Sequence, residues 1–192
     1  MPWRGPEEPG EFPTLGYQVA ELIEAKCAIP DREAQGEPFR VTDEQLMFLL
    51  FLYRIDPERG EFAYRRAQLT RPQKWGKGPF SAAIAAAEAH PEAPVRFDGW
   101  DVNGEPVGKP WPTPHIQITA VSEDQTDNIW RALLPMIELG DYAADVPDTG
   151  LTRVNLPNGG LIESVTASAR SRLGQRITFA VQDQTESWLK SN

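Results

Sequence analysis

The segment 71–79 constrains the fold of this chain more than any other part of its 192 residues. It reads RPQKWGKGP, and it lies between a run of β-forming residues at 62–70 and an alanine-rich, helix-forming run at 80–89. A Gly-Lys pair at the turn from a strand into a helix is typical of a phosphate-binding loop, because glycine lets the backbone approach an anion while lysine and the helix N-terminus supply positive charge. The sequence therefore predicts an α/β fold in which this loop holds a phosphate.

The distribution of charge supports an anionic ligand at this loop. The chain carries 19 basic and 28 acidic residues, for a net charge of −9, yet the segment 65–77 contains basic side chains and no acidic ones. The basic residues are Arg65, Arg66, Arg71, Lys74 and Lys77. The overall acidity argues against broad, sequence-independent coating of nucleic acid, whereas a local contact with DNA stays open.

The loop departs from the common pattern G-x-x-x-x-G-K-[ST] at two positions. Arg71 stands where the first glycine belongs, and Gly78 replaces the Ser or Thr whose hydroxyl ligates Mg²⁺. The spacing alone therefore leaves two interpretations open, a nucleotide-binding loop or a basic surface turn whose glycine begins a helix.

A second signal lies at 176–183, a β-forming run that ends in Asp183. A carboxylate at the carboxyl end of a central strand, opposite a phosphate loop, holds Mg²⁺ through water in nucleotide hydrolases. Aspartate also begins many ordinary turns. Asp183 therefore supports a nucleotide site only in combination with the loop.

Length and composition indicate one globular domain with an irregular arm. The chain is 40% hydrophobic, its longest apolar run (46–53) is too short to span a bilayer, and its first residues do not resemble a signal peptide. The single cysteine, Cys27, excludes an internal disulfide, and we expect it to be buried as a small apolar side chain. We expect His90 and His115 to lie in loops, and with one cysteine they argue against a zinc cluster.

The remaining elements alternate between helix and strand, which is typical of an α/β sheet. Residues 1–40 form a proline-rich arm with a short helical pattern at 17–28, and Thr42 with Gln45 is a capping-box signal for a buried helix that runs to residue 54. We expect residues 90–114 to be irregular. The other expected elements are a helix at 124–139, a strand at 116–121, and strands at 152–156 and 161–166 joined by a hairpin at Asn158-Gly159.

Taken in order, the motifs of this chain resemble those of the large terminase subunit of tailed bacteriophages, and in particular of phages that infect actinobacteria. The motifs are Thr42 to Gln45, Arg71 with Gly76-Lys77, 120–126, 166–169 with Gly174, Asp183-Gln184-Thr185, Phe97-Asp98-Gly99-Trp100 and Trp188. The resemblance extends from about residue 39 to the end of the chain.

The resemblance implies a P-loop NTPase domain at 41–192, with a mainly parallel central sheet flanked by helices, preceded by the arm at 1–40. The sequence ends just past the Walker B strand, so we expect the remaining ATPase strands and the family's nuclease domain to lie outside it. The implied function is an ATPase motor that drives double-stranded DNA into the procapsid. The implied partners are a homo-oligomeric ring, the portal protein and the small terminase subunit, in the host cytoplasm and without a membrane.

The resemblance also implies roles for single residues, with ATP and Mg²⁺ as cofactors. Gln45 reads adenine, whose donor and acceptor edge an amide can match, or it serves only as a cap. Asp183 holds Mg²⁺, and Arg172, with Arg170 as the runner-up, reaches the ATP of the neighbouring subunit. The phosphate loop comprises Arg71, placed to touch the γ-phosphate, then Pro72, Gln73, Lys74, Trp75, Gly76, the phosphate lysine Lys77, and Gly78.

Two departures from the family leave ATP hydrolysis open. Gly78 offers Mg²⁺ no hydroxyl, and Gln184 stands where the family has the glutamate that activates the attacking water, a role that Glu186 could take over. The alternative function is therefore a nucleotide-binding part of the motor that does not hydrolyse ATP. A helicase is disfavoured because the sequence lacks a basic or aromatic platform for single strands. A plain α/β interaction protein would not account for the ordered motifs.

Overall fold

A five-stranded sheet lies at the centre of the computed structural model, which describes residues 3, 5–7, 10–120, 123–146, 148–150, 152–166 and 176–183. The strand order is β6-β7-β8-β5-β9. The bounds are Asp148–Thr149 for β6, Arg153–Asn155 for β7, Leu161–Thr166 for β8, His115–Ala120 for β5 and Phe179–Gln182 for β9. β5 pairs in parallel with β8 and β9, whereas β6, β7 and β8 pair antiparallel. The sheet is therefore mixed rather than mainly parallel, because the expected hairpin joins one side of it.

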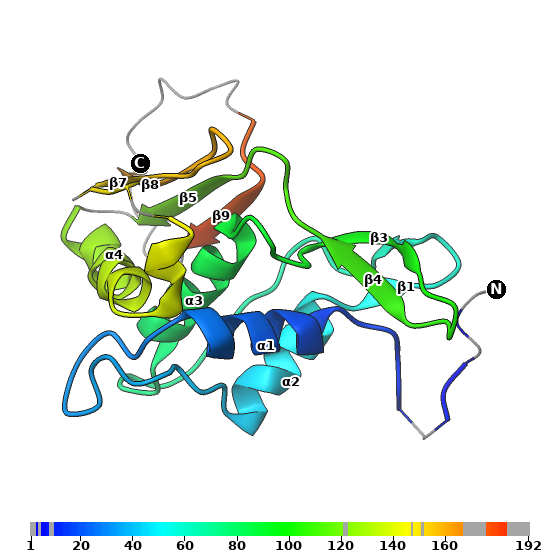
Figure 1. Cartoon of the computed structure of the whole chain (residues 1–192). Coiled ribbons are helices and arrows are strands. Elements are labelled where there is room, and N and C mark those ends of the chain that lie inside the picture. The colour runs from blue at the N-terminus through cyan, green and yellow to red at the C-terminus, as the bar shows by residue number, and fades with distance from the viewer. Residues whose placement is uncertain are drawn as a thin grey trace, which may run out of the picture.

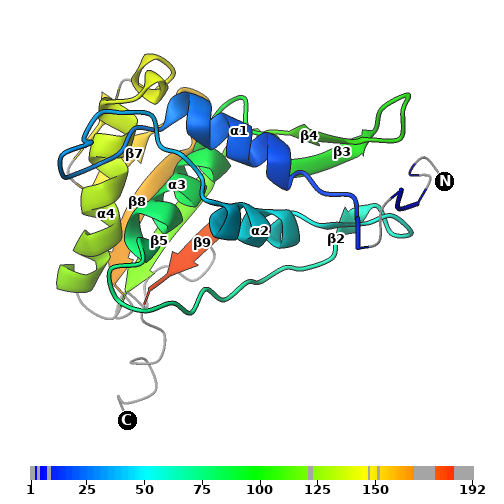
Figure 2. The same ribbon diagram turned by 90° about the horizontal axis from the view of Figure 1, so that it is seen from below.

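The four described helices lie on one face of this sheet (Figure 1). α3 (Lys77–Ala89) and α4 (Glu123–Glu138) pack against the strands, α1 (Gly16–Lys26) packs against α3, and α2 (Asp43–Leu52) packs against α1. Figure 2 shows the same helices from below. Alternate side chains of the strands face them, and Ile116, Ile118 and Ile162 are completely buried at this contact.

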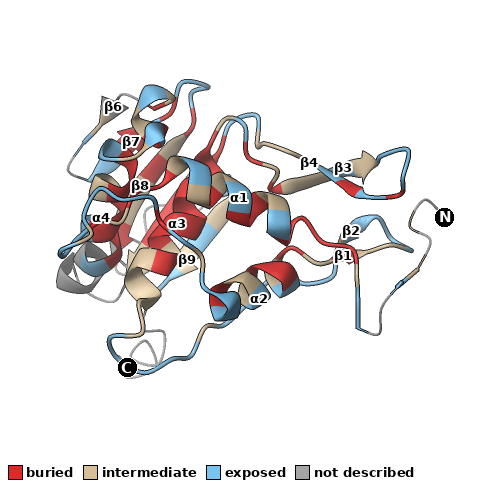
Figure 3. Ribbon diagram, turned by 60° about the horizontal axis from the view of Figure 1, so that its bottom comes forward, coloured by how far each residue is buried: buried red, intermediate tan, exposed pale blue. Residues whose placement is uncertain are grey.

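α3 is enclosed over most of its length, as the burial colouring of Figure 3 shows. Its buried side chains are Phe80, Ala82, Ala83, Ile84, Ala85, Ala86, Ala87, Glu88 and Ala89. Alanine methyl groups occupy little space, so strands, α1 and α4 can approach the axis of α3 closely while the interior keeps its packing density. The alanine-rich run thus forms the central helix of the fold.

The capping box predicted at Thr42 is confirmed. The Thr42 hydroxyl accepts a hydrogen bond from the Gln45 backbone N–H at 3.3 Å, and Gln45 Oε1 accepts one from the Thr42 N–H at 3.0 Å. The reciprocal pair satisfies two N–H groups that a helix start would leave without partners. α2 ends at Leu52, two residues before the predicted end at 54.

Two predictions about secondary structure are wrong. The strand expected at 62–70 is limited to β2 (Glu61–Phe62), which forms a hairpin with β1 (Ile55–Asp56), and 63–70 continues without strand pairing in the described structure. Local β-propensity cannot form a strand without a neighbour to pair with. The region 90–114 is not irregular, since β3 (Arg96–Trp100) and β4 (Pro106–Lys109) form an antiparallel hairpin that projects from the helices and sheet (Figure 1).

The arm, the histidines and the cysteine all contribute to packing. α1 buries Val19 and Ile23 completely, so this helix of the 1–40 segment belongs to the core, while the division at residue 40 stays a prediction. His90 directly follows α3, outside any helix or strand as predicted, whereas His115 is not a loop residue but begins β5. Each places Nε2 near a carboxylate, that of Asp145 at 3.1 Å and that of Glu163 at 2.8 Å. These partners are remote in sequence, so local sequence patterns cannot reveal them.

Cys27 is buried as predicted, and burial raises the pKa of its thiol to about 12. In the ranges that the structure describes, every helix is too short or too polar to cross a membrane.

Candidate functional site

The segment 71–76 forms a loop that leads directly into the first turn of α3. Gly76 has a φ of 98° and Lys74 a φ of 66°, both in the left-handed region that disfavours most side chains. A Cβ atom added at Gly76 would meet nothing within 4 Å, so space is open beside the backbone there. The first helical residues are Lys77, Gly78 and Pro79, and the N–H groups of Lys77 and Gly78 have no acceptor within the helix.

The side chain of Lys77, which follows the loop, contacts the backbone at the start of the loop. Its Nζ donates hydrogen bonds to the carbonyl oxygen of Arg71 at 2.6 Å and to that of Pro72 at 2.9 Å. The ammonium group therefore sits within the turn, next to the positive end of α3. A positive charge, free N–H groups and a helix dipole together favour an anion at this point.

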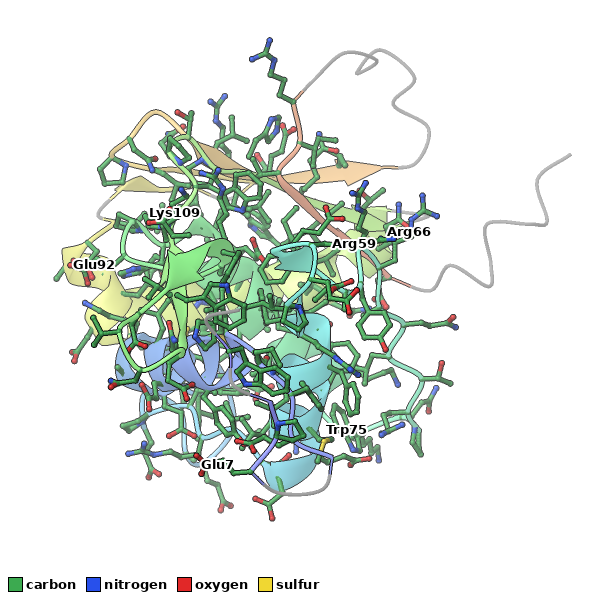
Figure 4. All side chains as sticks on the ribbon, turned by 90° about the vertical axis from the view of Figure 1, so that its right-hand side faces the viewer. Glu7, Arg59, Arg66, Trp75, Glu92 and Lys109 are labelled. Atoms are coloured by element: carbon green, nitrogen blue, oxygen red, sulfur yellow. The ribbon has the colours of Figure 1, made fainter. Side chains whose placement is uncertain are left out.

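A carboxylate from α2 holds the two ends of the loop. One oxygen of Glu44 lies 2.6 Å from Nη2 of Arg71, and the other accepts a hydrogen bond from Nε1 of Trp75 at 2.8 Å. The Arg71 guanidinium also lies 5.6 Å from the centroid of the Trp75 ring, and that ring makes an edge contact with Phe80. Figure 4 shows Trp75 beside α2. The hydrogen bond from Trp75, together with the charge of Arg71, lowers the pKa of Glu44.

Gln45 lies next to this contact, at the third position of α2, and its side chain is buried. Its carbonyl oxygen is engaged in the capping box with Thr42. The capping role is therefore established by geometry. The adenine-reading role stays a prediction, and it would use the remaining capacity of the same amide.

Asp183 follows β9 directly, and its backbone N–H donates to Thr119 of β5 at 2.9 Å. Parallel pairing brings the carboxyl ends of β5, β8 and β9 to one end of the sheet. The N-terminus of α3 lies at that same end (Figures 1 and 2). A Cβ at Gly78 would lie 3.7 Å from the carbonyl oxygen of Asn128 in α4, the helix that follows β5. The loop and Asp183 thus share one end of the sheet.

Several predicted site residues lie outside the described part of the chain. They are Arg170, Arg172, Gln184 and Glu186. Their roles in hydrolysis stay predictions. Pro72 and Gln73 are described and lie exposed in the loop.

The fold with this loop is similar to that of a protein of known structure. The chain superposes on the crystal structure of the large terminase of bacteriophage HK97 with a TM-score of 0.63 and 21% identity, over 88% of this chain. The chain has a terminase-like fold. In sequence it is similar to the gene 13 protein of Mycobacterium phage L5, at 35% identity over 184 residues, and to that of Mycobacterium phage D29, at 39% over 153 residues.

These matches cover most of this chain but a minor part of each relative. They span 96% and 78% of this chain for the two gene 13 proteins, but only 29% and 25% of those proteins and 31% of the HK97 protein. No protein-family model matches the sequence. The chain therefore corresponds to less than a third of the length of these relatives.

The residues at this end of the sheet fit a metal ion that binds together with a nucleotide phosphate. Within the described ranges, no group of three His, Cys, Asp or Glu side chains could hold a metal ion. Mg²⁺ bound together with a nucleotide takes most of its ligands from phosphate oxygens and water, with one or two protein carboxylates. Asp183 can supply one carboxylate, and Gly78 supplies no hydroxyl. The donor set is too small for a dedicated ion site and sufficient for Mg²⁺ that arrives with phosphates.

Two carboxylates with defined partners were missed by sequence reasoning. Glu44 looked like an ordinary acidic residue in a first helical turn, and its partner Trp75 is 31 positions away, so no local signal could have found it. Glu88 had a signal, since it is the one charged residue in the alanine-rich run. It is buried, and it accepts hydrogen bonds from the Tyr53 hydroxyl at 2.7 Å and from Trp111 Nε1 at 3.0 Å. Burial raises the pKa of Glu88 to about 7.

Proposed function

We propose that this chain carries the ATP-binding part of a viral DNA-packaging motor of the large terminase type. One observation carries the proposal: Lys77 begins α3 behind the left-handed Gly76, at the carboxyl ends of parallel strands in a terminase-like fold. Free N–H groups, a helix dipole and a lysine lie together at this helix start, which is a favourable place for phosphate. The similarity to gene 13 proteins of two mycobacteriophages supports a role in a phage.

In the proposed site the triphosphate lies between the loop and Asp183, with the base toward the start of α2. Lys77 and the first N–H groups of α3 bind the phosphates, and Asp183 holds Mg²⁺ through water. Gln45 lies on the α2 side, next to Glu44 and thus to the loop. The remaining proposed partners follow from the motor type: double-stranded DNA, a ring of identical subunits, the portal protein and the small terminase subunit, in the host cytoplasm.

A second candidate function is nucleotide binding without hydrolysis. Gly78, the second residue of α3, has no hydroxyl for Mg²⁺, and Ser81 lies most of a helical turn further along the same helix. Binding needs the loop and the helix start, whereas hydrolysis also needs a positioned metal and a base for the attacking water. Nucleotide binding is therefore the core of the proposal, and turnover separates the two candidates.

The proposal is tested by titrating the protein with ATP in a calorimeter, before and after Lys77→Ala. We expect at least about tenfold weaker binding, since a hydrogen bond to a charged group contributes about 1.5–3 kcal/mol. Arg65→Gln is the matched control, because Arg65 belongs to the same basic segment but lies before the loop and pairs with Glu61. It should bind ATP within about twofold of the parent. Equal ATP affinity of the parent and Lys77→Ala, with both folded by circular dichroism, would remove the proposed site.

A further inference from the structure

Two cations of the phosphate loop, Arg71 and Lys77, already have partners within the protein. Arg71 is paired with Glu44, and the Lys77 ammonium is bonded to the carbonyl oxygens of Arg71 and Pro72. A phosphate that binds Arg71 or Lys77 must therefore replace a bond that this side chain makes within the protein. The two replacements differ, because the partners of Lys77 are neutral carbonyl groups whereas the partner of Arg71, Glu44, is negatively charged.

Glu44 combines two contacts in one carboxylate. Its Oε1 forms an ion pair with Arg71, the first residue of the loop, and its Oε2 accepts a hydrogen bond from Trp75, the fifth. One side chain of α2 therefore contacts the loop at two positions. The side chains of Arg71 and Glu44 keep 38% and 51% of their surface exposed. An ion pair this exposed is weak, so a multiply charged anion can displace it at small cost.

We propose that Glu44 is a gating carboxylate of the phosphate loop: it holds Arg71 against Trp75 and competes with an incoming phosphate for the guanidinium. This inference rests on the function proposed above and adds a specificity-determining residue to that site. Only an anion that binds Arg71 better than a carboxylate does can release it. A triphosphate, with several negative oxygens for a bidentate contact, meets that condition, whereas a monoanion does not.

The two roles of Glu44 can be separated by substitution. Glu44→Gln removes the charge but keeps an amide oxygen that can accept from Trp75, so the loop stays attached to α2 while Arg71 is released. Asp43→Asn is the matched control, because it removes one charge from the same helical turn and Asp43 is exposed. Arg71→Gln removes the group for which Glu44 and phosphate compete.

The experiment measures binding of inorganic tripolyphosphate by calorimetry, without metal, so that no base contact contributes. We expect Glu44→Gln to bind it about two- to fivefold more tightly than the parent, the range that corresponds to losing one exposed ion pair. Asp43→Asn should change the affinity by less than Glu44→Gln. In an Arg71→Gln background the gain from Glu44→Gln should disappear, which a purely structural role of Glu44 would not produce.

The possible failures are distinguishable. If the parent binds tripolyphosphate through Lys77, but Glu44→Gln binds equally or less tightly, the gate is refuted and the proposed function stands. If Asp43→Asn produces the same gain, or if the gain persists without Arg71, the effect is one of general charge and the gate is again refuted. If Lys77→Ala leaves tripolyphosphate binding unchanged, the proposed function and the gate are overturned together.

Discussion

Buried Glu88 should contribute stability to this protein that is lost as the pH rises toward neutrality. Glu88 lies on α3, is buried, and accepts hydrogen bonds from Tyr53 and Trp111 with its carboxyl group. Burial raises its pKa from 4.5 to about 7, and the two hydrogen bonds only partly oppose this shift. Between these pH values the native state keeps a proton that the unfolded state has released. The native state then binds more protons, so its free energy of unfolding falls as the pH increases.

The size of the effect follows from the shift. One pKa unit corresponds to about 1.4 kcal/mol, so a shift from 4.5 to about 7 removes about 3 kcal/mol between mildly acidic and slightly alkaline solution. The stabilising proton is fully bound in the native state below pH 4.5, and its contribution is lost as the pH passes about 7. That loss is a sizeable part of the 5–15 kcal/mol that typically stabilises a domain.

Glu88→Gln tests this reasoning because the amide resembles the protonated acid. Its oxygen can accept from Trp111 while its NH₂ group donates to the Tyr53 oxygen, so both contacts survive without a titrating proton. Urea unfolding followed by circular dichroism, at several pH values from about 5 to about 8, gives the free energy of unfolding. Glu88→Gln should match the parent near pH 5 and exceed it by up to about 3 kcal/mol near pH 8. Glu21→Gln, which changes an exposed carboxylate of α1, should keep the parent's pH dependence. Burial lowers the pKa of His90 and acts in the opposite sense, so the difference between parent and variant is what isolates Glu88. A Glu88→Gln variant with the same pH dependence as the parent would refute the reasoning.

Two further predictions concern α2 and the segment after β9. Thr42→Ala should lower the free energy of unfolding by about 1 kcal/mol because it breaks the capping box. Thr70→Ala, at an exposed position, is an almost neutral control, and an unchanged free energy for Thr42→Ala would mean that α2 does not depend on its cap. Gln184→Glu should raise ATP turnover, since a missing general base costs about 10²–10⁴-fold in rate. If turnover is unchanged by Gln184→Glu but abolished by Glu186→Gln, the catalytic carboxylate lies two residues further along the chain.

Local signals in the sequence predicted those parts of the fold that local chemistry determines. The Thr42 cap, the hairpin at Asn158-Gly159 and the helix predicted at 80–89 each depend on a few neighbouring residues. That helix begins three residues earlier than predicted, at Lys77. Gly159 has the positive φ of 78° that such a turn requires. Asp183 was placed at the end of a strand for the same reason, since the β-forming run before it is short and ends at a polar residue.

The failures concern strand pairing and a contact between segments that are remote in sequence. The run 63–70 has β-forming residues but no described partner strand, and propensity says nothing about partners. The β3–β4 hairpin was missed because the prolines around it suggested an irregular segment, although Asn103-Gly104 marks its turn. In that turn the Asp101 side chain accepts hydrogen bonds from two backbone N–H groups. In the site, the loop itself was predictable, whereas the contact of Glu44 with Arg71 and Trp75 depends on how α2 packs beside it.

The alanine-rich composition of α3 has a mechanical consequence for the whole domain. Between Phe80 and Ala89 most of the enclosed side chains are methyl groups, which have no alternative rotamers with which to absorb a displacement. A shift of the first turn must therefore move α3 as one rigid rod against α1, α4 and the strands, or not move it at all. Whatever binds at Lys77 is in this way connected, over the length of thirteen residues, to the opposite end of the helix at His90.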